Sequence, residues 1–180
     1  MKITKYILGT TALAAALTIS AQAADPNDAQ IAAIVVAANQ VDIDAGKLAQ
    51  SKASSNEVKT FGQTMVTDHT GVNKAAVDLV TKLNVTPEEN PTSKSLKADG
   101  KKTLERLKKL NGPAFDKAYV DNEVTYHQTV LDAVDKVLIP NAKNPELNAL
   151  LVKVRPAFVA HLEHAKHLQA SLGKVSKAKS

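Results

Sequence analysis

Apolar residues recur along most of the chain at alternating spacings of three and four residues, the period of an amphipathic helix. The pattern predicts four long helices, at about residues 27–52, 54–84, 113–139 and 145–172, and a shorter one at about 95–110. Glycine, proline and capping residues stand almost entirely between these segments, and none of the segments keeps the strict alternation typical of a strand. We therefore expect an all-α protein.

The stretch 85–112 is a long connection between the second and third long helices. Its short helix of 16 residues would cover about 24 Å at 1.5 Å per residue, enough to run along a bundle. The other connections are short, which favours antiparallel hairpins. The pattern thus predicts a ferritin-like four-helix bundle with a short extra helix in its long connection. A simple up-down-up-down bundle is the alternative.

The first residues have the features of a secretion signal rather than of a folded element. Lys2 and Lys5 precede an apolar run at 7–19, and Ala21-Gln22-Ala23 matches an A-x-A cleavage site. The run is shorter than the roughly 20 residues of a membrane span, and no second candidate follows it. We therefore expect a cleavable signal peptide, with an uncleaved anchor as the alternative.

Cleavage after Ala23 divides the chain into a signal peptide at 1–23, a helical-bundle domain at 24–173 and a flexible basic tail at 174–180. A chain with such a signal is expected in the periplasm or otherwise outside the cytoplasm, and association with the outer membrane stays open. After cleavage we expect no stable membrane span.

Composition removes several function classes. The absence of cysteine excludes disulfides and an acylated lipoprotein anchor. The net charge of +5 is modest, the lysines are scattered, and three Tyr and three Phe without Trp give no stacking platform, so we expect no nucleic-acid partner. There is also no nucleophile-elbow motif and no glycine-rich phosphate loop, which argues against an enzyme without deciding the question. A protein partner or a homodimer is not indicated either way.

Three histidines carry the strongest chemical signal. His69, His127 and His161 each fall on the apolar stripe of a separate long helix, within about two residues of that helix's midpoint. They are therefore expected to meet at one depth of the bundle. A neutral imidazole is a good metal ligand, whereas a charged one is costly to bury. The spacing predicts a mid-bundle site for one transition-metal ion, such as Zn, Cu, Fe or Ni.

Carboxylates near the same depth are candidates to complete this site. Asp44 is the first choice, as a ligand or as an outer partner that orients an imidazole, because it shares a face with apolar residues of the first helix. Asp42, Asp68 and Glu123 are alternatives. Asp68 is expected to point toward another helix or water, and Glu123 is interpreted as an ordinary surface acid.

Other polar side chains are interpreted as peripheral. His164 and His167 rotate off the core stripe and are expected at the rim, in water. Tyr119 and Tyr126 are expected to pack with their hydroxyl groups at the surface. No Glu-x-x-His occurs anywhere in the chain, which argues against the carboxylate-bridged iron pair of ferritin-like enzymes.

Two functions remain open from the residues alone. The first is a metal-binding bundle protein with its site at mid-bundle. The second is a structural or stress-related interaction module, in which the buried histidines form a hydrogen-bonded layer that sets helix register.

A family resemblance is carried by the segments 42–53 (Asp-Ile-Asp-Ala-Gly-Lys-Leu-Ala-Gln-Ser-Lys-Ala) and 58–69 (Val-Lys-Thr-Phe-Gly-Gln-Thr-Met-Val-Thr-Asp-His), by Phe115-Asp116-x-x-Tyr119, by His127, and by Asn144-Pro145-Glu146 leading to Pro156 and His161-Leu162. Together they resemble a bacterial family of exported proteins catalogued as domain of unknown function number 4142, often labelled as membrane or outer-membrane proteins. The resemblance implies a ferritin-like helical bundle outside the cytoplasm, with no established activity, cofactor or substrate. It also implies that the three core histidines are family positions, whereas the family usually has glutamate where this chain has aspartate in the first helix.

Overall fold

A computed structural model describes residues 25–177 of the chain. The predicted signal peptide at 1–23 lies outside the described residues, and so do residues 178–180 of the predicted tail. The described chain forms α1 (Asp28–Lys52), α2 (Asn56–Lys82), α3 (Pro91–Lys108), α4 (Gly112–Ala133), the π-helical turn η1 (Val134–Leu138), α5 (Ile139–Asn141) and α6 (Pro145–Lys177). No residue of this part forms a strand, so the all-α prediction is confirmed.

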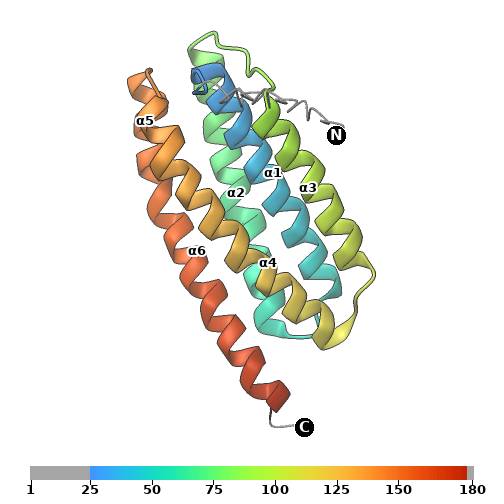
Figure 1. The fold of residues 1–180 in the computed structure, drawn as a ribbon. Helices are drawn as coiled ribbons and strands as arrows, with labels where there is room; N and C mark the ends of the chain where they lie inside the picture. The colour runs from blue at the N-terminus through green and yellow to red at the C-terminus, as the bar shows by residue number, and fades with distance from the viewer. Residues whose placement is uncertain (1–24, 178–180) are drawn as a thin grey trace, which may run out of the picture.

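The long helices form a bundle in which α3 lies beside α1 and runs in the same direction (Figure 1). Near one end, the Asn90 side chain donates to the Gln30 carbonyl at 3.1 Å, and at the other Lys52 Nζ donates to the Lys108 carbonyl at 2.6 Å. The connection therefore crosses the bundle from end to end, so that α2 and α4 run parallel (Figure 1). The helical bundle is confirmed, and its likeness to ferritin-like proteins stays a prediction.

The α1–α2 hairpin is held together at two glycines. A Cβ atom at Gly46 would lie 2.7 Å from the Gly62 carbonyl oxygen, and one at Gly62 would lie 2.9 Å from the Gly46 carbonyl oxygen. Real Cβ atoms do not approach backbone oxygens that closely, so only glycine allows the two helices this separation.

Among residues 25–177, no helix is both long enough and apolar enough to cross a membrane.

The apolar core has two main parts, one toward each end of the bundle. The first surrounds Phe61 and Phe115, and the second surrounds Ile31 and Leu151. Between them, at mid-height, most of the buried polar and charged side chains gather, five of which are Asp42, His69, Glu123, His127 and His161. The sequence thus places a polar layer between two apolar ones.

Two aspartates near the starts of helices accept hydrogen bonds from the turns between other helices, one at each end of the bundle. Asp116, near the start of α4, accepts hydrogen bonds from the backbone N–H groups of Ser54 and Ser55, both at 2.9 Å, and from the Ser54 hydroxyl at 2.5 Å. Asp28, in the first turn of α1, accepts from the N–H groups of Lys143 and Asn144 at 2.8 and 2.9 Å. These bonds tie the bundle together across long sequence separations.

The Phe115-Asp116-x-x-Tyr119 motif is accounted for by this arrangement, since both aromatic rings are fully buried and Asp116 holds the α1–α2 turn.

Asp116→Ala should lower the free energy of unfolding by about 2 to 3 kcal/mol, because the two backbone N–H groups lose a charged acceptor. Urea denaturation measures this. Asp132→Ala, which removes an exposed partner of Lys136, is the control and should change stability by less than about 0.5 kcal/mol. Equal effects in the two variants would contradict the role given to Asp116.

One end of each of two helices differs from the sequence prediction because of a proline. The short helix begins at Pro91 rather than near residue 95, because Asn90 and Ser93 form a capping box and proline is well suited to the first helical turn. The third long helix does not end at Pro140. A π turn precedes it, with the Ile139 N–H donating to the Val134 carbonyl, and the helical path continues to Asn141. The last helix reaches Lys177, within the segment predicted as a flexible tail.

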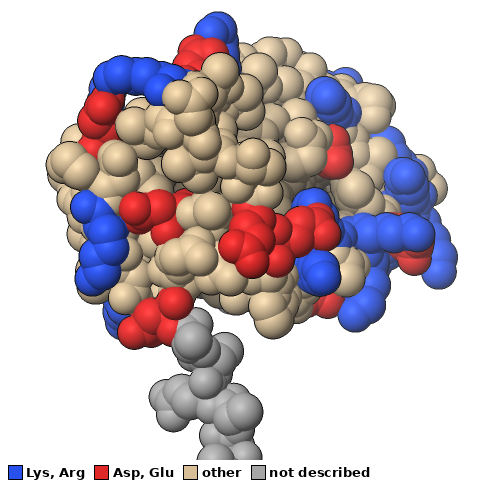
Figure 2. All heavy atoms as spheres, turned by 90° about the horizontal axis from the view of Figure 1, so that it is seen from above, with Lys and Arg blue, Asp and Glu red and all other residues tan. Residues whose placement is uncertain are grey.

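Charged side chains of both signs reach the end of the bundle seen in Figure 2. Exposed ion pairs of the described chain include Lys82 with Glu146, and Lys97 with Glu89. Exposed pairs of this kind contribute little to stability.

Candidate metal centre

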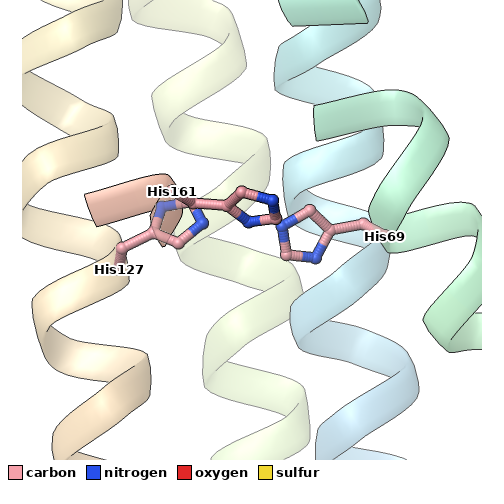
Figure 3. A group of neighbouring side chains, drawn as sticks. All are labelled: His69, His127 and His161. Atoms are coloured by element: carbon pink, nitrogen blue, oxygen red, sulfur yellow. The ribbon is translucent and has the colours of Figure 1, made fainter. Parts of the chain in front are cut away.

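Three imidazole rings from three helices meet at the centre of the bundle (Figure 3). The ring centroids of His69 (α2), His127 (α4) and His161 (α6) lie 5.2 to 5.6 Å apart. One ring nitrogen of each lies within 4.8 Å of one from each of the others, and the three residues are 2%, 1% and 5% exposed. The prediction that these histidines meet at one depth is confirmed.

The His69 ring is oriented by an asparagine of α1. Its Nδ1 lies 2.6 Å from Asn39 Oδ1, while Asn39 Nδ2 donates to the Val35 carbonyl at 2.8 Å. Because the amide nitrogen is used by Val35, the amide oxygen faces the ring and can only accept. His69 therefore carries its proton on Nδ1 and presents a lone pair at Nε2.

The other two rings are oriented in the same way by acceptors. His127 Nδ1 lies 3.1 Å from the backbone carbonyl of Glu123, and His161 Nε2 lies 2.8 Å from Asp68 Oδ2. Each of these nitrogens must donate. The opposite nitrogen of each ring, like that of His69, is buried and has no hydrogen-bond partner among residues 25–177; the three are His69 Nε2, His127 Nε2 and His161 Nδ1.

Burial keeps these imidazoles uncharged at neutral pH. Removal from water, together with the neighbouring imidazoles, lowers the pKa of His69 to about 2. Removal from water, followed by His161, lowers the pKa of His127 to about 4. Burial also lowers the pKa of His161, against the opposing effect of Asp68. All three are therefore in the form that binds metals.

A pair of buried carboxyl groups adjoins the histidines. Asp42 Oδ2 lies 3.4 Å from His69 Nε2, and Glu123 Oε2 lies 3.5 Å from His127 Nδ1, without the alignment of a hydrogen bond. One oxygen of each acid and one nitrogen of His127 lie within 4.8 Å of one another. Burial, followed by the charge of Glu123, raises the pKa of Asp42 well above its ordinary value, and burial raises the pKa of Glu123 to about 7. Both shifts favour the protonated form of the pair.

The structure places the predicted carboxylates differently from the sequence. Asp44, the first choice, is half-buried and accepts from Gln40 Nε2 at 2.9 Å, away from the histidines. The aspartate of α1 that faces them is Asp42. Residues two apart on a helix point to nearly opposite sides. The prediction of Asp44 as the aspartate nearest the histidines was wrong because α1 packs against both α2 and α3. Apolar residues therefore cover two sides of α1 and do not indicate which side faces the site.

Glu123 and the two tyrosines were also misplaced. Glu123 is 0% exposed and lies at the site rather than at the surface. Tyr119 is fully buried, and its hydroxyl has no partner within the described part of the chain. The Tyr126 hydroxyl donates to the Ala38 carbonyl at 3.0 Å. Asp68 reaches another helix, as expected, and contacts His161.

Sequence reasoning missed Asn39, which orients His69. The signal that could have found it is a lone asparagine in an otherwise apolar stretch of α1, one turn before Asp42. An amide at such a position needs a partner when it is buried. His164 and His167 are exposed, so their predicted place at the rim is confirmed.

The fold and the site define an all-helical bundle protein with three converging buried histidines. The chain belongs to the family described as domain of unknown function DUF4142, whose sequence model matches residues 13–168. No curated protein and no solved structure matches the chain. The family resemblance is thus confirmed, and it brings no activity with it.

Proposed function

We propose that this protein binds one transition-metal ion at mid-bundle, with His69 Nε2, His127 Nε2 and His161 Nδ1 as ligands and Asp42 as the fourth. The observation that carries the proposal is the set of three neutral imidazoles whose outer nitrogens are all held by acceptors. Metal-binding histidines almost always donate their other N–H in this way. The protein acts outside the cytoplasm, as its first residues predict.

The donor spacing supports a tetrahedral ion. Metal–ligand bonds of about 2.0 to 2.2 Å at tetrahedral angles separate neighbouring ligand atoms by about 3.4 Å. Asp42 Oδ2 and His69 Nε2 are 3.4 Å apart. One nitrogen from each histidine lies within 4.8 Å of one from each of the others, so these nitrogens have to move closer together to bind one ion. Three nitrogens and one oxygen, without sulfur, suit Zn, Cu, Fe or Ni.

The second candidate function is a structural module in which this layer only sets helix register. The hydrogen bonds that His69 donates to Asn39 and that His161 donates to Asp68 favour it, because they link α2 to α1 and α6 to α2. Against it, a purely structural layer would leave three buried lone pairs without partners, at an energetic cost for each.

The decisive experiment is zinc titration of untagged, chelator-treated protein by calorimetry, with elemental analysis of the product. One equivalent should bind. His127→Gln, which keeps a polar side chain of similar size, should weaken binding by about 100-fold or more, because it removes a ligand. His167→Gln, at the exposed rim, is the matched control and should bind as the native chain does.

Two results would contradict the metal proposal. Folded protein that binds no zinc, copper, nickel or iron would leave the structural module as the better account. Loss of binding in His167→Gln rather than in His127→Gln would assign the metal to the surface.

A further inference from the structure

A cavity of about 140 Å³ opens beside the histidines, between α1, α4, η1 and α6. Apolar side chains such as Ile34, Val130, Leu138, Leu151 and Val154 form most of its wall. Its volume is close to that of an engineered apolar cavity, about 150 Å³, that binds benzene. The cavity therefore fits a molecule of about one aromatic ring.

One part of the wall is polar. Asp42 and His69 both line the cavity, and both are only 2% exposed. Asp42 Oδ1 has no hydrogen-bond partner in the part of the chain that the structure describes. Asp42 Oδ2 is the oxygen that lies 3.4 Å from His69 Nε2, so His69 leaves Oδ1 unused.

The wall also selects against charge and favours aromatic rings. None of the described residues that line it is lysine or arginine, so an anion would be buried without a counter-ion at high cost. Two aromatic side chains line the cavity, Tyr126 and Phe158, and Phe158 stacks on His69 at 5.3 Å between ring centroids.

The π turn is a second, independent indication of a binding site. Val134 and Leu138, its first and last residues, both line the cavity. Such turns are rare in helices and occur frequently at functional sites.

A groove lies next to the cavity on the outside of the bundle. This groove, of about 360 Å³, lies between α1, α3 and α4 and shares Thr92, Leu96, Tyr126 and Thr129 with the cavity. These four residues line both spaces.

We propose that this cavity binds one small, neutral, single-ring molecule that carries a hydroxyl group, a ligand of the class of phenol. A hydroxyl both donates and accepts, so it satisfies Asp42 Oδ1 whether that carboxyl group is protonated or not. The site uses neither the ring nitrogens nor the Asp42 Oδ2 atom assigned to the metal. The proposal therefore does not depend on metal binding.

The test is an NMR titration of the metal-free chain with phenol, following the backbone amide signals. We expect saturable binding of one molecule, with shifts confined to residues 34–42, 92–96, 126–138 and 151–158 and to the surroundings of His69, the parts of the chain that line the cavity. Phenol should bind roughly 2- to 10-fold more tightly than benzene, the effect of one net hydrogen bond. Absence of saturation, or shifts spread over the surface, would overturn the proposal.

Two variants that fill the cavity sharpen this test. Ala133→Leu and Ala38→Val add side-chain volume at half-buried lining positions, and each should weaken phenol binding by about 10-fold or more. Ala170→Leu, at an exposed position of α6, is the control and should leave binding unchanged. Native affinity in both filled variants would also overturn the proposal. The unaltered chain locates the site by itself, so a variant that fails to fold does not prevent a decision.

Discussion

With zinc at about 1,000 times its dissociation constant, the free energy of unfolding should be about 4 kcal/mol higher than that of the metal-free protein. The physical reason is that the three histidines come from three helices far apart in the sequence. The unfolded chain does not hold them together, so the ion binds almost only to the folded state. For a chain of this size the increase corresponds to a rise in melting temperature of about 8 to 16 °C. Urea denaturation with and without zinc measures it.

The control for this prediction separates the buried site from the surface. His127→Gln should lose most of the zinc-dependent stabilisation, whereas His164→Gln should keep it, because His164 is exposed on α6. Zinc held only by exposed side chains on one helix would stabilise the fold little. An equal response of the two variants to zinc would therefore rule out the mid-bundle position.

The convergence of the histidines could be predicted from the sequence because the side they face follows the helix period and their depth follows the helix midpoints. His69, His127 and His161 stand on stripes set by apolar residues, and each stripe belongs to a helix packed on one side. Errors at helix ends, such as those at Pro91 and Pro140, did not move the centres of these helices far.

The carboxylates could not be predicted in the same way. Whether Asp42 or Asp44 faces the site depends on how α1 is rotated between α2 and α3, which the apolar pattern of an alanine-rich helix does not specify. Glu123 is buried beside Asp42 of another helix, and Asn39 belongs to the site because its side chain accepts a hydrogen bond from His69. Such pairings join residues of different helices. They depend on how the helices pack, which the helical period of a single sequence does not specify.

The buried histidines and the buried carboxyl groups should change the pH dependence of stability in opposite directions. The pKa of His69 falls from its ordinary value of 6.5 to about 2 on folding, so below pH 6.5 the unfolded chain binds the proton more readily. The stability contributed by neutral His69 is therefore present above pH 6.5 and decreases as the pH falls, by about 1.4 kcal/mol per unit. Glu123 acts in the opposite sense. Its pKa rises from 4.5 to about 7, so the folded chain binds its proton more readily between these values and gains stability as the pH falls.

In metal-free buffer, we therefore expect two buried-site variants to depart from the native pH dependence in opposite directions. Between pH 7.0 and 4.5, Glu123→Gln removes a gain of about 3 kcal/mol, so it should lose about 3 kcal/mol more stability on acidification than the native chain does. His69→Gln removes a loss of about 3 kcal/mol over the same range, so it should lose about 3 kcal/mol less than the native chain does.

Urea denaturation of the three proteins at pH 7.0 and 4.5, with a chelator present, measures this difference of about 6 kcal/mol between the two variants. His167→Gln is the control, because this side chain is exposed on α6 and lies outside the buried set. Its pH dependence should match that of the native protein. Parallel pH dependence in Glu123→Gln and His69→Gln would mean that these groups do not titrate as a buried, opposing set. In that case the neutral state of the imidazoles, on which the proposed metal site depends, would have to be abandoned.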